Sequence, residues 1–537
     1  MPVTPVPGPE RPRRGGVRAA ELVASLSLAT DLGMRLPVEH GLRSTLVATR
    51  LGERLRIGHE TAVQVYYGCL LFYIGCTVDS QTNAELFEDG ALVEHFTPVM
   101  FASPPRTVAG LAGALAGTSG PPPARAYRVA VNLPRAVAGH RRHLAAMCEV
   151  ARMIVERVGL PGCVRELFGD LTERWDGRGD PGRLRGDRVP LAVRIVHVAR
   201  DAAFQCLLGG AEHAARTARG RGGHAFDPEI AALLADRAEE LLAPDTTESA
   251  WHEVLAREPA PELVLRGTEI DRALAAAGDF ADLLSPYLTG HSSGTARLAE
   301  AAARRLGLAE EDVSTVRRAG FVHDLGRVAV PPRIWGKSGP LTPDEWEQVR
   351  LHTYHGERVL CRSPFLAALV PAAVSHHERL DGTGYHRGLP APALGPAARL
   401  LAAADAYHAM TEPRPHREAL SPARAADGLV RQARDRRLDP GSVTAVLEAA
   451  GQRAPGLPRP AGLTGREAEV VALLARGLPT KRIGRVLGIS AKTADHHVQN
   501  AYAKIGVSTR AAAALFAMEH GLVAWGELPM PRERGPS

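Results

Sequence analysis

Seven residues between positions 291 and 405 carry side chains that bind metal ions. Two of them, His323 and Asp324, are adjacent in the segment AGFVHDLGRVAVP, so one helical turn supplies both an imidazole and a carboxylate. A single His indicates nothing, but the chain has only 21 His in 537 residues, and this pattern needs an explanation. The full set is His291, His323, Asp324, His352, His376, His377 and Asp405.

This donor set is typical of a centre that holds two metal ions. Imidazole and carboxylate without thiolate suit Fe, Mn or Zn. The two oxygens of Asp324 can bridge two ions about 3.5 to 4 Å apart. A water molecule held between two such ions has a much lowered pKa and becomes hydroxide near neutral pH. Because hydroxide attacks phosphorus, the set predicts hydrolysis of a phosphate ester.

The motifs that carry these residues resemble those of the HD-GYP family, the HD-domain phosphohydrolases that hydrolyse cyclic di-GMP. The match runs over residues 285–450 through HDLGR, LHTYHGE, HHERLDGTGY and AADAYHAMTEPRPHR, in that order. The resemblance implies two divalent ions as cofactors, with Fe or Mn favoured and Zn allowed. It assigns one ion to His291, His323, Asp324 and Asp405, and the other to Asp324, His352, His376 and His377.

The resemblance also implies roles for residues around the metals. Asp324 and Arg327 are the implied catalytic residues. Arg327 replaces a family Lys, keeps its charge and adds a bidentate donor. It is therefore expected to contact a substrate phosphate, together with Arg414 and Arg417. Support of the site is implied for Glu378, Asp381, Gly382, Gly384 and Tyr385.

Other positions depart from the family pattern. His386 stands where GYP has its Pro, and Thr353 replaces the Pro expected after His352. These changes affect a loop and a helix start more than the metal ligands. Tyr287 stands four residues before His291, where some members carry a carboxylate for a third metal, so two metals are expected. The change at GYP leaves open which dinucleotide is the substrate.

An internal repeat indicates how the fold positions these ligands. Gly75 follows His40 by 35 positions, just as Gly326 follows His291, and ERWDGRG at 173–179 aligns with ERLDGTG at 378–384. The offset falls from 251 to 205 between these matches, so the first copy has about 46 extra residues. They are placed around the Pro/Gly-rich stretch 104–126, which is expected to be a loop or flexible insertion.

The first copy has lost most of the metal ligands. Phe72 and Tyr73 stand opposite the central His–Asp pair, Arg200 stands opposite the last Asp, and only His40 keeps a ligand type. An apolar pair cannot hold a cation and Arg200 repels one, so the first copy is expected to be metal-free. The alternative is a metal-free ligand pocket lined for an anion by Arg174, Arg194 and Arg200.

The C-terminal segment 463–510 has the pattern of a helix-turn-helix. Thr464 and Glu467 predict a capping box before a first helix, residues 480–487 a short second helix, and Ser490 the cap of a third. Eight basic residues stand against three acidic ones, an excess of five that nearly equals the +6 of the whole chain. Such a local excess is expected of a surface that binds phosphates.

This segment resembles the LuxR-type (GerE-like) helix-turn-helix over its full length, through LTGREAEV, the KRIGRVLGIS turn and the closing EHGL. The resemblance implies that the third helix enters the major groove of DNA and that residues 509–520 form a dimer face, so a homodimer reads two half-sites. Asp495 is expected to weaken the non-specific attraction of the helix to DNA phosphates and to accept a hydrogen bond from a cytosine amino group. The alternative is a small bundle for protein contacts. The implied DNA contacts are Lys481, Arg482, Lys492, Thr493, Asp495, His496, Asn500 and Lys504.

The composition favours helices throughout. Aromatic residues make up 5% while Ala, Leu and Arg abound, so an all-α protein of about three or four domains is expected. Six Cys without a CxxC pair indicate a reducing compartment, and the cytoplasm is expected. The uncharged run 63–78 is shorter than the roughly 20 residues that a bilayer needs, so it predicts a buried helix and no membrane partner.

These patterns predict an order of domains and a function. The order is a disordered tail (1–16), a degenerate HD-like domain (17–243), an HD-GYP-like domain (244–453), a linker (454–462), a LuxR-type helix-turn-helix (463–527) and a final tail (528–537). We expect a transcriptional regulator that hydrolyses cyclic di-GMP or a related nucleotide. The competing hypothesis is a sensor that binds metal or nucleotide without turnover and changes the affinity of the tail for DNA.

Overall fold

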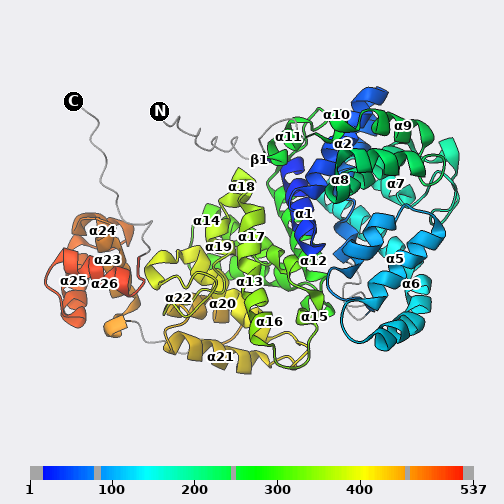
Figure 1. Ribbon diagram of the computed structural model, residues 1–537. Helices are drawn as coiled ribbons and strands as arrows, with labels where there is room; N and C mark the ends of the chain where they lie inside the picture. The colour runs from blue at the N-terminus through cyan, green and yellow to red at the C-terminus, as the bar shows by residue number, and fades with distance from the viewer. Residues whose placement is uncertain (1–15, 78–85, 244–248, 454–459, 524–537) are drawn as a thin grey trace, which may run out of the picture. The chain divides into compact units, whose positions relative to one another are not determined.

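The computed structural model describes residues 16–77, 86–243, 249–453 and 460–523 (Figure 1). The prediction of an all-α protein is confirmed: the described part contains one two-stranded antiparallel sheet, and the rest of its regular structure is helical. None of the described helices combines the length and hydropathy that a membrane crossing requires. Most of the predicted end segments and linker lies outside the described residues.

The chain divides into two compact units. The first holds the described residues up to Thr289 together with Leu325–Ala367. The second holds Gly290–Asp324 and the described residues from Ala368 onward. Residues 325–367 therefore group with the first copy of the repeat. The bounds 17–243 and 244–453 stay a prediction for independently folding domains.

The first unit is a helical assembly that contains a largely buried helix, α1 (Ala19–Gly33). Twelve of the 15 residues of α1 are buried, and most of them are small or apolar, as expected of a helix in a core. Its elements in order are β1 (Gly16–Arg18), α1, α2 (His40–Leu55), α3 (His59–Leu70), η1 (Ile74–Thr77), η2 (Leu92–Phe96), η3 (Thr97–Val99), α5 (Pro104–Ala116), α6 (Pro122–Val158), α7 (Gly162–Asp170), η4 (Gly186–Arg188), α8 (Leu191–Arg221), α9 (Pro228–Asp236), α10 (Ala238–Leu242), α11 (Ala250–Ala256), β2 (Val264–Arg266), α12 (Thr268–Asp282), η5 (Pro286–Leu288), η6 (Leu325–Ala329), α15 (Pro332–Trp335), α16 (Pro343–Arg350), α17 (His352–Leu360) and α18 (Pro364–Ala367).

The predicted loop at 104–126 is wrong, because most of this stretch is helical. Helix α5 occupies Pro104–Ala116, and α6 begins at Pro122. Both helices start with Pro in the first turn, where its missing N–H has no helical partner to lose. Glycine serves close packing here: a Cβ on Gly110 would lie 2.3 Å from the Val99 side chain and 2.6 Å from the His95 carbonyl oxygen. The Pro residues of this stretch therefore mark the starts of helices, and Gly110 allows close packing of α5 on its neighbours.

The matching turns of the two copies have the same geometry. A Cβ on Gly179 would lie 2.6 Å from the backbone nitrogen of Arg174, and a Cβ on Gly384 would lie 2.4 Å from that of Arg379. In each turn an Asp accepts from the backbone N–H two residues later, at 3.0 Å in both copies. Only glycine fits either position. This agreement supports the internal repeat read from ERWDGRG and ERLDGTG.

A buried arginine stands where the first copy lost its metal ligands. The guanidinium carbon of Arg200 lies 3.5 Å from the ring centroids of Phe72 and of Tyr73. Burial lowers the pKa of Arg200 to about 9, which still leaves it protonated at neutral pH. Burial and the nearby Arg200 charge lower the pKa of His40 to about 3. The first copy thus carries a fixed cation stacked on aromatic rings, which disfavours binding of a metal ion there.

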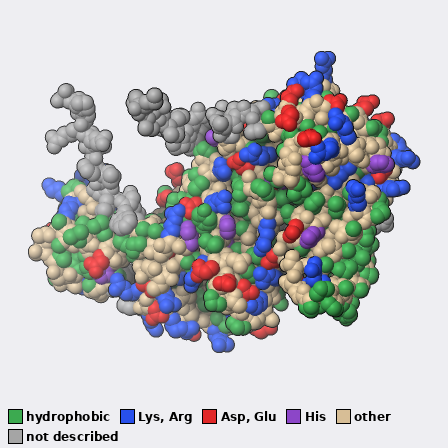
Figure 2. Space-filling view, in the orientation of Figure 1, with side chains coloured by type: hydrophobic (Ala, Val, Ile, Leu, Met, Phe, Trp, Pro, Cys, Tyr) green, Lys and Arg blue, Asp and Glu red, His purple; other side chains and the backbone are tan. Residues whose placement is uncertain are grey.

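The second unit contains the ligand-bearing helices and the C-terminal segment. Its elements are α13 (His291–Arg305), α14 (Glu310–Val322), α19 (Val370–Ala373), η7 (Ala391–Ala393), α20 (Pro396–Met410), α21 (Pro422–Arg434), α22 (Pro440–Ala449), η8 (Pro460–Gly462), α23 (Gly465–Ala475), α24 (Thr480–Val486), α25 (Ala491–Ile505) and α26 (Arg510–Glu519). In Figure 2 the two signs of charge are interspersed on the visible face.

The C-terminal helices form as predicted. Thr464 and Glu467 make the capping box of α23, and the Ser490 hydroxyl accepts from the Thr493 N–H at the start of α25. Buried side chains of α23, α24 and α25, including Val470, Ile483 and Val498, form a small hydrophobic core. The turn between α24 and α25 is tight, since a Cβ on Gly484 would lie 2.9 Å from the Ile489 carbonyl oxygen. The predicted helix-turn-helix is therefore present.

Candidate metal centre and DNA-binding helix

Six of the seven predicted metal ligands lie in the second unit, at the ends of helices or inside one. His291 is the first residue of α13, and His323 and Asp324 directly follow α14. His376 and His377 follow α19 after two further residues, and Asp405 lies in α20. All except His377 are buried. Helix ends bring these side chains together although they are far apart in sequence.

Asp324 is the centre of this group. One of its carboxylate oxygens, Oδ2, lies 3.0 Å from Nε2 of His323 and 3.4 Å from Nε2 of His291. The other, Oδ1, lies 3.4 Å from Nε2 of His376. Nε2 of His291 also lies 3.2 Å from Oδ1 of Asp405. Two sets of ligand atoms thus meet on opposite oxygens of one carboxylate, which is the arrangement that a bridging ligand needs.

The imidazole rings are fixed by hydrogen bonds of their other nitrogen. Nδ1 of His323 donates to the Gly320 carbonyl at 2.7 Å, and Nδ1 of His376 donates to the Ala373 carbonyl at 2.6 Å. Each acceptor stands three residues before its His, at the end of a helix. With Nδ1 carrying the proton, Nε2 is the nitrogen presented to Asp324. Such outer hydrogen bonds are the usual support of a metal-binding His.

His291 receives its support from a residue that sequence reasoning missed. Nδ1 of His291 lies 2.8 Å from Oε2 of Glu412, and Nε2 of His408 lies 3.2 Å from Oε1 of the same carboxylate. His408 lies in α20, three residues after Asp405, and Glu412 follows His408 by four residues, two positions past the end of the helix. The spacing of His408 and Glu412 after Asp405 in AADAYHAMTE is the sequence feature that could have indicated this support. Glu412 orients the His291 ring, as a carboxylate does for a metal-bound His.

The charges in this group favour a cation. Burial raises the pKa of Asp405, but hydrogen bonds from His291 and His323 hold it well below its usual value. Burial lowers the pKa of His323, yet the Asp324 and Asp405 carboxylates raise it to about 9. Burial lowers the pKa of His376 to about 4, so this ring is neutral at pH 7. The carboxylates thus recruit positive charge, which a divalent cation would supply.

The predicted supporting residues build the turn that follows His377. The Glu378 carboxylate accepts from the backbone N–H groups of Arg387 at 2.9 Å and Leu389 at 2.8 Å. Asp381 accepts from both the backbone and the hydroxyl of Thr383. Gly382 has a φ of +75°, a conformation in which glycine is favoured.

Two further residues of this turn have defined places. Gly384 allows the close approach to Arg379 described above. The Tyr385 ring lies 4.7 Å from the ring of His377, measured between centroids. The turn therefore holds an aromatic ring beside one of the predicted ligands. The roles of these residues in a reaction stay a prediction.

His352 and Arg327 lie in the first unit. His352 is the buried first residue of α17, and its Nδ1 donates to the Val349 carbonyl at 2.5 Å, in the same manner as the other ligands. Arg327 is buried in η6, with its guanidinium 5.3 Å from the Trp335 ring centroid. Helix α17 packs closely on η6, since a Cβ on Gly326 would lie 2.0 Å from the His352 carbonyl oxygen.

The two other predicted phosphate contacts follow Asp405 in a short loop. Arg414 donates to the Glu412 carboxylate at 2.9 Å, so it belongs to the network that orients His291. Arg417 donates to the backbone carbonyls of Ala409 at 2.5 Å, Glu412 at 3.0 Å and Glu418 at 3.2 Å. Arg417 therefore stabilises the loop in this structure. Phosphate binding by either arginine stays a prediction.

The predicted DNA contacts lie on α24 and α25. Lys481 and Arg482 are exposed on α24, and Lys492, Thr493, Asp495 and His496 are exposed on α25, while Asn500 is half-buried. Lys504 differs, because its Nζ lies 2.6 Å from Oε2 of the buried Glu467 and ties α25 to α23. The first two turns of α25 thus present most of the predicted contacts. Their binding to DNA stays a prediction.

Two family models match the chain. Residues 277–441 match the HD domain, and residues 461–517 match the luxR family of bacterial regulatory proteins. The chain is 26% identical to the 3'3'-cGAMP-specific phosphodiesterase 3 of Vibrio cholerae over 75% of this chain and 88% of that protein. It is 35% identical to a cyclic di-GMP phosphodiesterase of Thermotoga maritima over 28% of this chain and 42% of the relative.

Two further similarities agree with these. The chain is 38% identical to a cyclic di-GMP phosphodiesterase of Pseudomonas aeruginosa over 31% of this chain and 40% of that protein. The crystal structure of a cyclic GMP-AMP specific phosphodiesterase of V. cholerae superposes with a TM-score of 0.56 at 23% identity, covering 81% of this chain and 98% of that one. This likeness extends the shared fold well beyond the HD domain.

Proposed function

We propose that this chain, which joins an HD domain of the HD-GYP kind to a luxR-family helix-turn-helix, hydrolyses a cyclic dinucleotide and regulates transcription. Both resemblances drawn from the sequence are confirmed at the level of the family. The relatives are named as phosphodiesterases of cyclic di-GMP or 3'3'-cGAMP, which defines the proposed class of substrate. The observation that carries the proposal is the meeting of three imidazole Nε2 atoms on the two oxygens of Asp324.

The imidazole and carboxylate donors suit two divalent ions of Fe, Mn or Zn, and the resemblance to the HD-GYP family favours Fe or Mn. In the proposal His291, His323 and Asp405 would hold one ion, His352, His376 and His377 would hold the other, and Asp324 would be a ligand of both. When bound, the two ions lower the pKa of a shared water and neutralise charge on the phosphoryl oxygens.

His352 is included because of its local packing. Gly326 stands two residues after Asp324 and packs on the first turn of α17, where His352 lies. His352 also shows the Nδ1-to-carbonyl hydrogen bond of the other ligands, so Nε2 is its metal-binding nitrogen. The short sequence distance from Asp324 to Gly326 and the packing of Gly326 on α17 therefore both support His352 as a metal ligand.

The arginines around the ligands bind the substrate in this proposal. Arg327 follows Asp324 by three residues in the sequence. A guanidinium binds phosphate through two parallel hydrogen bonds. Arg414 is held by Glu412 and can exchange that partner for a phosphoryl oxygen. Arg327 and Arg414 would orient the phosphodiester, and Arg417 would hold their loop.

The DNA part of the proposal rests on α25. Its exposed first turns would enter the major groove, with Lys481 and Arg482 on phosphates. Leu515 on α26 is 62% exposed, and a homodimer that covers this side chain would read two half-sites. A transcriptional regulator of this kind acts in the cytoplasm.

One experiment separates the enzyme from a sensor that binds without turnover. Purified protein is analysed for metal by mass spectrometry and assayed with cyclic di-GMP and 3'3'-cGAMP. We expect about two ions per chain, and we expect a linear dinucleotide product from at least one of the two cyclic dinucleotides. Asp324→Ala should lose both metal and turnover, and Asp312→Ala, an exposed control on α14, should keep both. Metal without turnover of either dinucleotide would exclude the enzyme and leave the sensor.

A further inference from the structure

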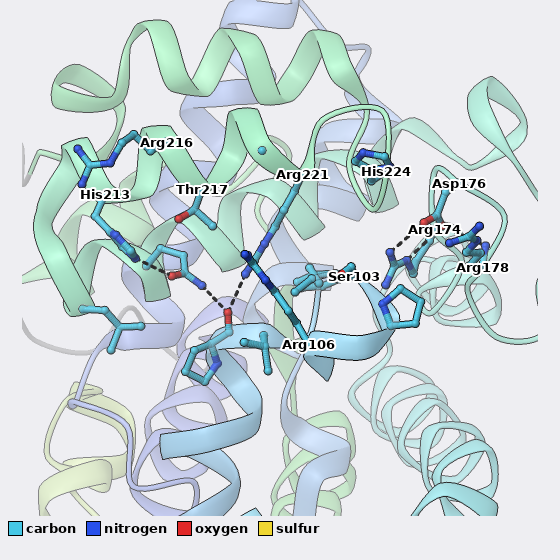
Figure 3. A pocket seen from close by; sticks show the side chains of 18 residues that line it. Ser103, Arg106, Arg174, Asp176, Arg178, His213, Arg216, Thr217, Arg221 and His224 are labelled. Atoms are coloured by element: carbon cyan, nitrogen blue, oxygen red, sulfur yellow. Dashed lines mark hydrogen bonds and ion pairs between the residues drawn. The ribbon is translucent and has the colours of Figure 1, made fainter. Parts of the chain in front are cut away.

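The first copy contains a large pocket that the proposed function does not use. It has a volume of about 780 Å³ and is lined by three segments: residues 98–106 before and at the start of α5, the turn at 174–178, and residues 205–224 in and just after the second half of α8 (Figure 3). Such a volume is typical of pockets that bind small molecules. All of its lining residues belong to the first unit.

The pocket is strongly basic. Its arginines outnumber its single carboxylate, Asp176, by five to one, and two His also line it. The arginines are Arg106, Arg174, Arg178, Arg216 and Arg221. Figure 3 shows Arg106 and Arg221 at the middle of the pocket and Arg174 and Arg178 together at one side. Like charges gathered in one cavity repel each other unless an anion lies between them.

Two of these arginines are fixed and two face the pocket without a carboxylate. Arg221 is buried, pairs with Asp201, and donates to the Pro98 carbonyl at 2.7 Å. Arg174 makes two hydrogen bonds to Asp176, at 2.9 and 3.2 Å. Arg106 and Arg178 are exposed, and neither guanidinium has an ion-pair partner among the described residues. The pocket thus has two arginines that are held by other residues, and two exposed arginines that can move to contact a ligand.

The remaining lining indicates what accompanies the anionic group. Pro98, Val99, Phe101 and Leu208 give the pocket an apolar wall. The buried Gln205 adds an amide that is held by the Pro98 carbonyl at 2.9 Å and by His213 at 3.1 Å. A flat heterocyclic base with a hydrogen-bonding edge suits such a wall, and phosphoryl groups suit the arginines.

The position of the pocket agrees with the internal repeat. The offset of 205 places the lining turn 174–178 opposite 379–383, the turn that follows the ligand His377. The same offset places pocket residues 205–221 opposite 410–426, which follow the ligand Asp405 and include Glu412. The pocket therefore opens where the second copy has the approach to its metal centre. Arg200, which stands opposite the ligand Asp405, does not line the pocket and is stacked on the Phe72 ring.

We propose that the first copy is a non-catalytic binding site for a phosphate-bearing nucleotide. Of the three arginines that the sequence suggested for an anion pocket, only Arg174 lines it. Arg194 pairs with Asp187 and Asp227, and Arg200 lies in the aromatic core. Arg106, Arg178 and Arg221 supply the charge in their place.

The test is equilibrium binding to the full-length protein in excess EDTA, which removes metal-dependent binding at the other site. Calorimetry with GTP, ATP, cyclic di-GMP and inorganic pyrophosphate as separate probes should show one site per chain for at least one nucleotide. Replacing Arg106 and Arg178 together with Ala should weaken that binding by about tenfold or more, since each removes a charged hydrogen bond. Arg219→Ala is the matched control, an exposed α8 arginine outside the pocket that pairs with Asp236.

Three results would overturn the proposal. The first is the absence of heat with all four probes. The second is nucleotide binding that is equal in the double variant and the wild type. The third is binding of pyrophosphate alone, which would identify a simple anion site without recognition of a base.

Discussion

At the residue scale, the metal centre depends on how each imidazole is held. His323, His352 and His376 all donate Nδ1–H to a carbonyl three residues earlier, and His291 uses Glu412 instead. The spacing of His residues in the sequence predicts ligands, but the tautomer comes from these backbone acceptors. His291 is the exception, because its Nδ1 is held by the Glu412 side chain and not by a backbone carbonyl.

Glu412 gives the first prediction. Glu412→Gln should keep the hydrogen-bond geometry but weaken the orientation of His291, lowering metal affinity by about 10- to 100-fold. Titration with Mn²⁺ followed by calorimetry measures this directly. Glu418→Gln, an exposed change in the same loop, is the control. Equal affinity in wild type and Glu412→Gln would show that Glu412 has no such role.

Gly384 gives a second prediction at this scale. A Cβ at this position would lie 2.4 Å from the Glu378 Cα and the Arg379 nitrogen, which are backbone atoms that cannot move alone. Gly384→Ala should lower the free energy of unfolding by about 1 to 3 kcal/mol and reduce turnover, because the turn beside His377 must shift. Thermal melting and the dinucleotide assay check both effects. Gly339→Ala, at an exposed loop position where a Cβ meets nothing within 4 Å, should change neither.

At the element scale, a buried carboxylate joins α1 to α2 in the first copy. Asp31 accepts from the Gly41 N–H at 3.1 Å, and burial raises its pKa from 3.8 to about 8. The folded protein therefore holds this proton more tightly than the unfolded chain does. Its contribution to stability is complete below pH 4 and is lost as the pH rises toward 8.

This loss of stability with rising pH gives the third prediction. The melting temperature of the transition that reports on the first copy should fall between pH 5 and pH 8 in the wild type. Asp31→Asn keeps an oxygen acceptor for Gly41 but does not ionise, so its melting temperature should fall less over the same interval. An equal fall in both proteins would mean that Asp31 is not the group responsible.

The recognition helix gives the fourth prediction. Lys492 is exposed at the start of α25, whereas Lys504 near its end pairs with Glu467. Lys492→Ala should weaken binding to promoter DNA and reduce the slope of log affinity against log salt by about 1. Arg466→Ala, which removes a half-buried arginine of α23 paired with Glu469, serves as control. An unchanged slope would remove Lys492 from the DNA interface.

The sequence predicted several elements correctly and missed others for physical reasons. Capping boxes and glycine turns are local, so the helices of the C-terminal segment followed from their own residues. Helix α5 was missed because the Pro and Gly content of 104–116 resembles a loop, while the packing that stabilises the helix is non-local. The pairing of Lys504 with Glu467 joins residues 37 apart, so helical periodicity alone could not show it.

At the scale of the whole molecule, the two copies of the predicted repeat carry different side-chain chemistry. The second copy gathers His and Asp around a carboxylate, and the first has Arg200 on aromatic rings and a basic pocket. A repeat that keeps its turns while exchanging its ligands suits a regulator that reads one nucleotide and hydrolyses another. Coupling to the helix-turn-helix requires that a ligand binds two states of the chain with different affinity.

The central claim is metal-dependent hydrolysis at Asp324, and its most direct test is the rate of dinucleotide cleavage by one preparation before and after removal of metal. Protein stripped with a chelator should be inactive toward cyclic di-GMP and 3'3'-cGAMP. Reloading with Mn²⁺ or Fe²⁺ should restore cleavage of at least one of them in the wild type but not in Asp324→Ala. Cleavage that persists in fully stripped protein, or that reloaded Asp324→Ala still performs at the wild-type rate, would contradict the account.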